Sequence, residues 1–194
     1  MKKITIDTNC IIDLEEERES EKYVRSLIKM HGERKISLRV VSIGASERKI
    51  EGSYVANFRE FKDKLEKVGL DKVEILRPIG YYGISFWGQG LWANEKMIEL
   101  EEKIHKILFP GYEFKCKEYF ESLDAEYSHD SPLYHKWRNA KCDVLSLWAH
   151  IHFHGDVFVT SDKNFHKQSK KSDLINLGAG AILTPEETIF FLNN

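Results

Sequence analysis

Residues 3–7 read KITID, and residues 8–10 read TNC. The first stretch is short, rich in residues that favour strands, and bounded by polar residues, which is typical of a β-strand. Asp7, Thr8 and Asn9 are residue types that cap helices, so we expect a helix to begin near Cys10. A strand that leads directly into a helix is the opening unit of a parallel α/β sheet.

The rest of the chain repeats this alternation of strands and helices. We expect further strands at residues 36–41, 73–76, 156–160 and 180–183. We expect helices at residues 20–30, 50–68, 93–108, 114–123, 143–153 and from residue 184. The pattern predicts an α/β fold in which helices cover both faces of a parallel sheet.

Composition narrows the class of protein. A chain of 194 residues and 22.7 kDa is expected to form a single domain, residues 1–194. The formal net charge of −2 indicates that the chain as a whole is not a basic nucleic-acid-binding protein. Three cysteines without a CxxC pair argue against a disulfide framework or a zinc ribbon. No apolar run approaches the roughly 20 residues of a membrane span, so we expect a cytoplasmic protein without a membrane partner.

Four acidic residues are expected to meet at one edge of the sheet. Asp7 and Asp162 follow strands, Asp143 begins an expected helix, and Glu47 lies one turn beyond a strand. Ligand sites of open α/β sheets form at the carboxyl ends of the strands. Clustered carboxylates repel one another unless a cation binds them, and oxygen ligands select Mg²⁺ or Mn²⁺. The alternative is structural, since any single Asp at a helix start can be a cap.

The order of these motifs resembles the PIN-domain ribonucleases. The resemblance rests on residues 4–9 (ITIDTN), Ser42 with Glu47, residues 73–76 (VEIL), Cys142 with Asp143, and residues 160–165 (TSDKNF). It implies a three-layer α/β/α fold with a five-stranded parallel sheet in the order 3-2-1-4-5. It also implies Mg²⁺- or Mn²⁺-dependent endonucleolytic cleavage of single-stranded RNA that leaves a 3′-hydroxyl. The chain is longer than the compact toxins of this family, with an insertion within residues 78–138.

Matched position by position, the resemblance assigns the catalytic and metal-binding acids and two polar neighbours of the site. The acids are Asp7, Glu47, Asp143 and Asp162, and the neighbours are Asn9 and Ser161. It leaves open a homodimer and an inhibitory partner protein. A catalytically weak module of the same fold that binds RNA or protein is the alternative function. A metal-dependent phosphatase is disfavoured because residues 7–9 lack the second Asp of a DxD signature.

Basic residues flank the expected site. Residues 131–171 hold seven Lys or Arg and three acids, a net of +4 in a chain of net −2. We expect Lys163, Lys167 and Arg138 to contact the phosphates of the substrate, the alternative being a solvated charged surface.

Two other segments have competing interpretations. Residues 150–154 (HIHFH) could bind zinc or nickel, but His150 lies seven residues from Asp143 and is expected to point away from the acids. Residues 78–92 (PIGYYGISFWGQGLW) carry aromatic and glycine residues without a charge. They could form a lid on the core, an oligomer interface or a surface that stacks on unpaired bases.

Overall fold

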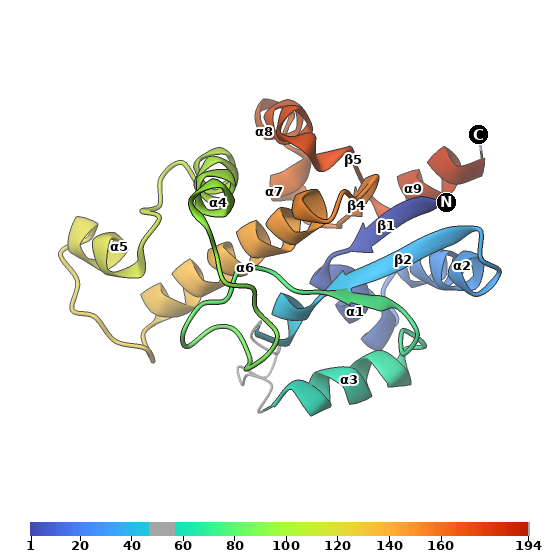
Figure 1. The fold of residues 1–194 in the computed structure, drawn as a ribbon, viewed down its shortest axis with the longest axis horizontal. Coiled ribbons are helices and arrows are strands. Elements are labelled where there is room, and N and C mark those ends of the chain that lie inside the picture. The colour runs from blue at the N-terminus through green and yellow to red at the C-terminus, as the bar shows by residue number, and fades with distance from the viewer. Residues whose placement is uncertain (47–56, 194) are drawn as a thin grey trace.

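The computed structural model describes residues 1–46 and 57–193, and Figure 1 shows the arrangement of its elements. One parallel sheet lies at the centre, with the strand order β3-β2-β1-β4-β5. This arrangement confirms the α/β fold predicted from the sequence and the strand order that the resemblance implied. The strands are β1 (Lys2–Ile6), β2 (Ile36–Val41), β3 (Glu74–Leu76), β4 (Val157–Val159) and β5 (Ala181–Leu183).

Helices cover both faces of the sheet. The hydrophobic core on one face includes residues of α1 (Thr8–Glu15), α2 (Glu21–Gly32), α3 (Phe58–Lys67) and α9 (Pro185–Asn193). The core on the other face includes residues of α4 (Glu95–Leu108), α5 (Cys116–Ser122), α6 (Pro132–His152), α7 (Lys163–His166), α8 (Gln168–Leu174) and the π-helical turn η2 (Ile175–Ala179). A 3₁₀ turn, η1 (Ser42–Ser46), follows β2 at the carboxyl edge of the sheet.

The alternation of side chains along the strands separates the two cores. In β4, Val157 and Val159 pack into the core beside α1 and α2, whereas Phe158 packs into the core beside α6. All three side chains are fully buried. Successive residues of a strand point to opposite faces, so a strand covered on both faces is apolar throughout.

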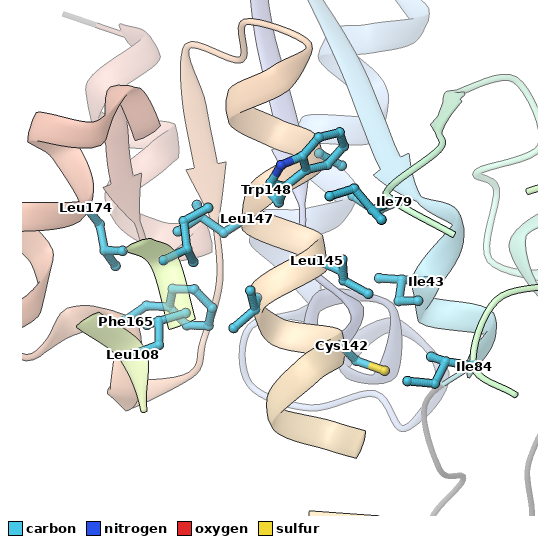
Figure 2. Close-up of a cluster of buried hydrophobic side chains, with 14 of the residues drawn as sticks. Ile43, Ile79, Ile84, Leu108, Cys142, Leu145, Leu147, Trp148, Phe165 and Leu174 are labelled. Atoms are coloured by element: carbon cyan, nitrogen blue, oxygen red, sulfur yellow. The ribbon is translucent and has the colours of Figure 1, made fainter. Parts of the chain in front are cut away.

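Helix α6 is the central element of the larger core. Residues 144–150 are all buried, which is the pattern of a helix surrounded by other elements. Figure 2 shows Leu145 and Trp148 of α6 among side chains from η1 and the segment after β3, and Leu147 on the side of Phe165 and Leu174.

The start of α6 corrects one sequence prediction. We expected a helix at residues 143–153, but α6 begins at Pro132 and therefore places Asp143 in its middle. Ser131 is the N-cap, and its hydroxyl oxygen accepts a hydrogen bond from the backbone N–H of Tyr134 at 3.1 Å. The cap followed by proline at the first helical position is a standard helix start, which the polar composition of the region obscured.

Two further predictions about helices have different outcomes. The described part of the apolar helix expected at residues 50–68 is α3, and residues 47–56 lie outside the described residues. The start expected at residue 184 is confirmed, because the Thr184 hydroxyl oxygen accepts from the Glu187 N–H at 3.2 Å and Glu187 Oε2 accepts from the Thr184 N–H at 2.8 Å.

An ion pair is buried between α4 and α6. Lys141 Nζ lies 2.8 Å from Glu101 Oε1, and both side chains are at most 1% exposed. The Tyr81 hydroxyl donates to Glu101 Oε2 at 2.7 Å, and the Lys141 ammonium lies 3.7 Å from the centre of the Phe114 ring. These contacts tie the residues between β3 and α6 to the central helix.

Among the helices that the structure describes, none combines the length and apolar composition of a membrane span.

Candidate active site

Asp7 is the central acid of the candidate site. It follows β1 directly and occupies the N-cap position of α1, at the carboxyl edge of the sheet. The residue is buried, with 3% of its surface exposed. Its carboxylate oxygens accept hydrogen bonds from two hydroxyls, Thr160 Oγ1 at 2.8 Å and Ser146 Oγ at 3.3 Å. Asp7 is therefore held by the residue that follows β4 and by α6 as well as by its own strand.

Burial raises the pKa of Asp7 from 3.8 to about 6. Desolvation is the largest cause, and the nearby negative charge of Asp162 acts in the same direction. The hydrogen bonds from Thr160 and Ser146 oppose the rise because they stabilise the charged form. A carboxyl group with such a shift at a strand end is a typical functional-site candidate.

Asp162 belongs to the turn after β4. Its carboxylate accepts from the backbone N–H of Asn164 at 2.8 Å, so it caps the short helix α7. Its own backbone N–H donates to Thr160 Oγ1 at 3.1 Å. The buried Thr160 hydroxyl is thus shared by the two acids, since it donates to Asp7 and accepts from the backbone of Asp162.

Asp143 is half-buried in the middle of α6. It lies three residues before Ser146, and residues at this spacing share a helix face. Because Ser146 donates to Asp7, Asp143 belongs to the face of α6 that is directed to this edge of the sheet. Glu47, the fourth predicted acid, lies outside the described residues.

The two predicted polar neighbours lie close to the acids. Asn9 Oδ1 is 3.4 Å from Thr160 Oγ1. Ser161 donates through its hydroxyl to Asp13 Oδ2 at 3.1 Å. Asp13 is 4% exposed and also lies 3.6 Å from the guanidinium of Arg18. Ser161 is therefore hydrogen-bonded to Asp13, an acid of α1 that was not predicted from the sequence.

Sequence reasoning missed the hydroxyls of Thr160 and Ser146 as well as Asp13. Thr160 closes a strand-like segment, where a threonine is expected for its β propensity alone. Ser146 follows Asp143 by three residues, and this helical spacing was the available signal for it. Asp13 lies six residues after Asp7, which is not a spacing that places two residues on one helix face.

The predicted phosphate contacts lie on two elements. Lys163 and Lys167 are exposed at the two ends of α7, next to Asp162. Arg138 is half-buried in α6 and interacts with the hydroxyl of Tyr134. Lys170 differs from the other lysines, because its ammonium donates to Asn164 Oδ1 at 2.6 Å and to the carbonyl oxygen of Leu108. It serves to join α8 to α4.

The histidines at residues 150–154 lie at the other end of α6. His150 is fully buried, and its Nε2 donates to the carbonyl oxygen of Ala179 at 2.9 Å. Desolvation lowers its pKa to about 4, so it is neutral in the folded protein. It packs beside Gly155 and the buried guanidinium of Arg39, where a Cβ on Gly155 would lie 2.1 Å from the ring of His150. This position agrees with the prediction that His150 points away from the acids.

The cysteines beside the acids are buried in the core. Burial is the largest cause that raises the pKa of the Cys10 thiol well above its ordinary value, and the charges of Asp7 and Asp13 add to it. A thiol in this setting stays protonated, which agrees with a packing role rather than a nucleophilic one.

The described side chains provide few protein ligands for a metal ion at this site. Within residues 1–46 and 57–193, no three Asp, Glu, His or Cys side chains are grouped so that they could hold a metal ion by themselves. Two carboxylates that influence each other, Asp7 and Asp162, remain. Mg²⁺ is usually held by one or two carboxylates together with water and substrate phosphates, so this pair fits such an ion.

Comparisons of the chain with protein-family models, with curated proteins and with solved structures give no match.

Proposed function

We propose that this protein is a metal-dependent endoribonuclease that cleaves single-stranded RNA at the carboxyl edge of its sheet. The observation that carries the proposal is the position of Asp7, a buried carboxyl group at the end of β1 whose hydrogen-bond donor, the Thr160 hydroxyl, also accepts from the backbone N–H of a second acid, Asp162. Burial also raises the pKa of Asp7 to about 6. This edge is where open parallel α/β sheets place their ligands. Two acids that repel each other at neutral pH favour a bound divalent cation.

Asp7 and Asp162 are the residues that would hold Mg²⁺ or Mn²⁺, and Asp143 faces the same edge. Glu47 stays a predicted ligand from the sequence. A bound divalent ion supplies an activated water and compensates the charge that develops on a phosphodiester during displacement.

The chain's own residues have distinct roles in this proposal. The Thr160 hydroxyl fixes the orientation of Asp7 by donating to Oδ2, and Ser146 restrains Oδ1. Both carboxylate oxygens keep further lone pairs for a cation, because each oxygen accepts one hydrogen bond from these two hydroxyls. Lys163 and Lys167 are exposed at the two ends of α7, the short helix that Asp162 caps, and their positive charge attracts a phosphate backbone.

The test is cleavage of a single-stranded RNA in Mn²⁺ and in EDTA. The wild-type protein is expected to cleave only with Mn²⁺, and Asp7→Asn and Asp143→Asn are expected to remove cleavage. Asp71→Asn is the matched control, since Asp71 is an exposed acid just before β3, at the opposite edge of the sheet. A folded wild-type protein that binds the RNA but never cleaves it would replace the enzyme with a binding module of the same fold.

A further inference from the structure

The segment at residues 78–92 exposes three aromatic side chains almost completely. Tyr82, Trp87 and Trp92 are 104%, 97% and 99% exposed. Both faces of each ring are therefore open to solvent. Aromatic side chains normally bury much of their area, whereas these three rings in one short segment leave their faces free to stack on a ligand.

The backbone that carries these rings is held firmly. The Gly80 N–H donates to the Leu91 carbonyl oxygen at 3.0 Å, and the Leu91 N–H donates to the Pro78 carbonyl oxygen at 2.8 Å. Between these two hydrogen bonds the backbones of Gly80 and Gly90 approach so closely that a Cβ on Gly90 would lie 2.4 Å from the Gly80 Cα. The rings thus extend from a closed loop whose ends are fixed.

Two anchors connect this loop to the candidate site. The Ser42 hydroxyl, just after β2, donates to the Gln89 carbonyl oxygen at 3.0 Å. The same turn touches the residue after Asp7, because a Cβ on Gly44 would lie 2.7 Å from Thr8 Oγ1. Figure 2 shows the second anchor, where the buried Ile84 lies beside Cys142, the neighbour of Asp143.

Each anchor has a ring two residues before it. Tyr82 precedes Ile84, and Trp87 precedes Gln89. Tyr82 and Trp87 therefore lie close in sequence to the contacts that attach the loop to the turn after β2 and to α6, and Trp92 directly follows Leu91, whose backbone N–H and carbonyl oxygen close the loop. If a phosphate of an RNA strand lies at Asp7 and Asp143, the neighbouring nucleotides of that strand lie near the residues to which the loop is attached.

We propose that Tyr82, Trp87 and Trp92 form a stacking surface for unpaired bases of the single-stranded RNA whose backbone passes the acids. This inference rests on the proposed function. Stacking needs an open ring face and no charge, and the loop has three open rings and no charged residue. The positive charge for the phosphates lies elsewhere, on Lys163 and Lys167 at the two ends of the short helix that Asp162 caps. Base and phosphate contacts are thus divided between two segments at one edge.

The geometry favours bases over a second protein as the occupant. A protein interface usually has a contiguous apolar centre surrounded by polar residues. Here each of the three rings is nearly fully exposed, so none is covered by another ring of the set. Separate flat rings suit separate flat bases.

The test is binding of a labelled single-stranded RNA of about 12 nucleotides, within the usual range of single-strand sites, in EDTA to prevent metal-dependent cleavage. Trp87→Ala and Trp92→Ala are each expected to weaken binding by about 5- to 150-fold, the range for loss of one stacked base. Trp87→Tyr and Trp92→Tyr are expected to keep most of the affinity. Phe190→Ala, an exposed ring on α9, is the matched control.

Two further readouts separate stacking from other roles. Trp87 and Trp92 are exposed whereas Trp137 and Trp148 are buried, so RNA is expected to quench the fluorescence of the exposed pair. An abasic strand of the same length and charge is expected to bind more weakly and to be insensitive to Trp87→Ala. Equal affinity of the abasic strand would overturn the proposal, as would a wild-type dimer that Trp87→Ala converts to monomer without changing RNA affinity.

The outcomes also separate this inference from the proposed function. If the wild-type protein cleaves RNA with Mn²⁺ but the Trp→Ala variants bind RNA normally, only the stacking surface is wrong. If binding depends on the rings but no cleavage occurs, the stacking surface stands and the ribonuclease proposal fails.

Discussion

Replacing Asp7 by Asn is expected to stabilise the metal-free protein. The pKa of Asp7 is raised from 3.8 to about 6, chiefly by burial. A carboxyl group whose folded pKa is raised favours folding below its unfolded pKa, and that contribution is lost as pH rises through the folded pKa. A shift of about 2 units corresponds to about 3 kcal/mol at pH 7, because each unit is worth 1.36 kcal/mol.

The asparagine side chain that replaces Asp7 keeps its size and can exchange hydrogen bonds with Thr160 and Ser146, whose hydroxyls also accept. We therefore expect the free energy of unfolding of Asp7→Asn to exceed that of the wild type by about 3 kcal/mol at pH 7, or less if one hydrogen bond is lost. The difference should shrink to below about 1 kcal/mol near pH 4, where the wild-type carboxyl is protonated in the folded state and partly protonated in the unfolded state.

The assay is urea unfolding in EDTA at several pH values between 4 and 7.5 for both proteins, with Asp71→Asn as the surface control. Using the difference between variant and wild type cancels the titration of other groups, including His150. In Mn²⁺ the order is expected to reverse, because only the wild type gains stability from the bound ion. A variant that is less stable than the wild type at pH 7 in EDTA, or a difference that is constant with pH, would refute this account of Asp7.

Three other outcomes are expected. Lys141→Met is expected to destabilise the protein by about 3–5 kcal/mol, since it leaves the buried Glu101 without its partner, and the double variant Lys141→Met with Glu101→Leu should recover most of this in urea unfolding. His150→Gln with His154→Gln should leave Mn²⁺-dependent cleavage unchanged, and a large loss of activity in the folded variant would assign these residues to the site. The same variant should lose less stability than the wild type between pH 6.5 and 4, because the lowered pKa of the buried His150 causes part of that loss. Lys163→Gln with Lys167→Gln should reduce the slope of log RNA affinity against log salt by up to about 1.4, at about 0.7 per phosphate contact, and an unchanged slope would make these lysines a solvated surface.

The strand pattern made the fold predictable. The β-strands of this chain are short apolar runs bounded by polar turns. Parallel strands that are buried on both faces typically have this sequence pattern, because every side chain along them is buried. The order of the strands came from the resemblance rather than from the pattern, because periodicity does not determine which strands are neighbours. The start of α6 was mistaken because residues 124–131 are polar and exposed for the most part, which concealed the cap at Ser131.

The acids of the site were predictable only as positions along the chain. Asp7 and Asp162 follow strands, and this local rule placed them at one edge of the sheet. Their surroundings depend on residues distant in sequence, such as the Thr160 hydroxyl that lies 153 residues after Asp7. For the same reason the Glu101–Lys141 pair and the buried Arg39 had no sequence signal, since a charged residue is expected at the surface unless its partner is known.

The most direct test of the central claim is single-turnover cleavage of a labelled single-stranded RNA with Mn²⁺, followed by analysis of the new ends. Attack by an activated water leaves a 3′-hydroxyl and a 5′-phosphate, whereas attack by the 2′-hydroxyl of the RNA leaves a 2′,3′-cyclic phosphate. We predict 3′-hydroxyl ends that form only with the divalent ion, and their loss in Asp7→Asn but not in Asp71→Asn. Cyclic phosphate ends, or cleavage that persists in EDTA or in folded Asp7→Asn, would contradict the proposed site.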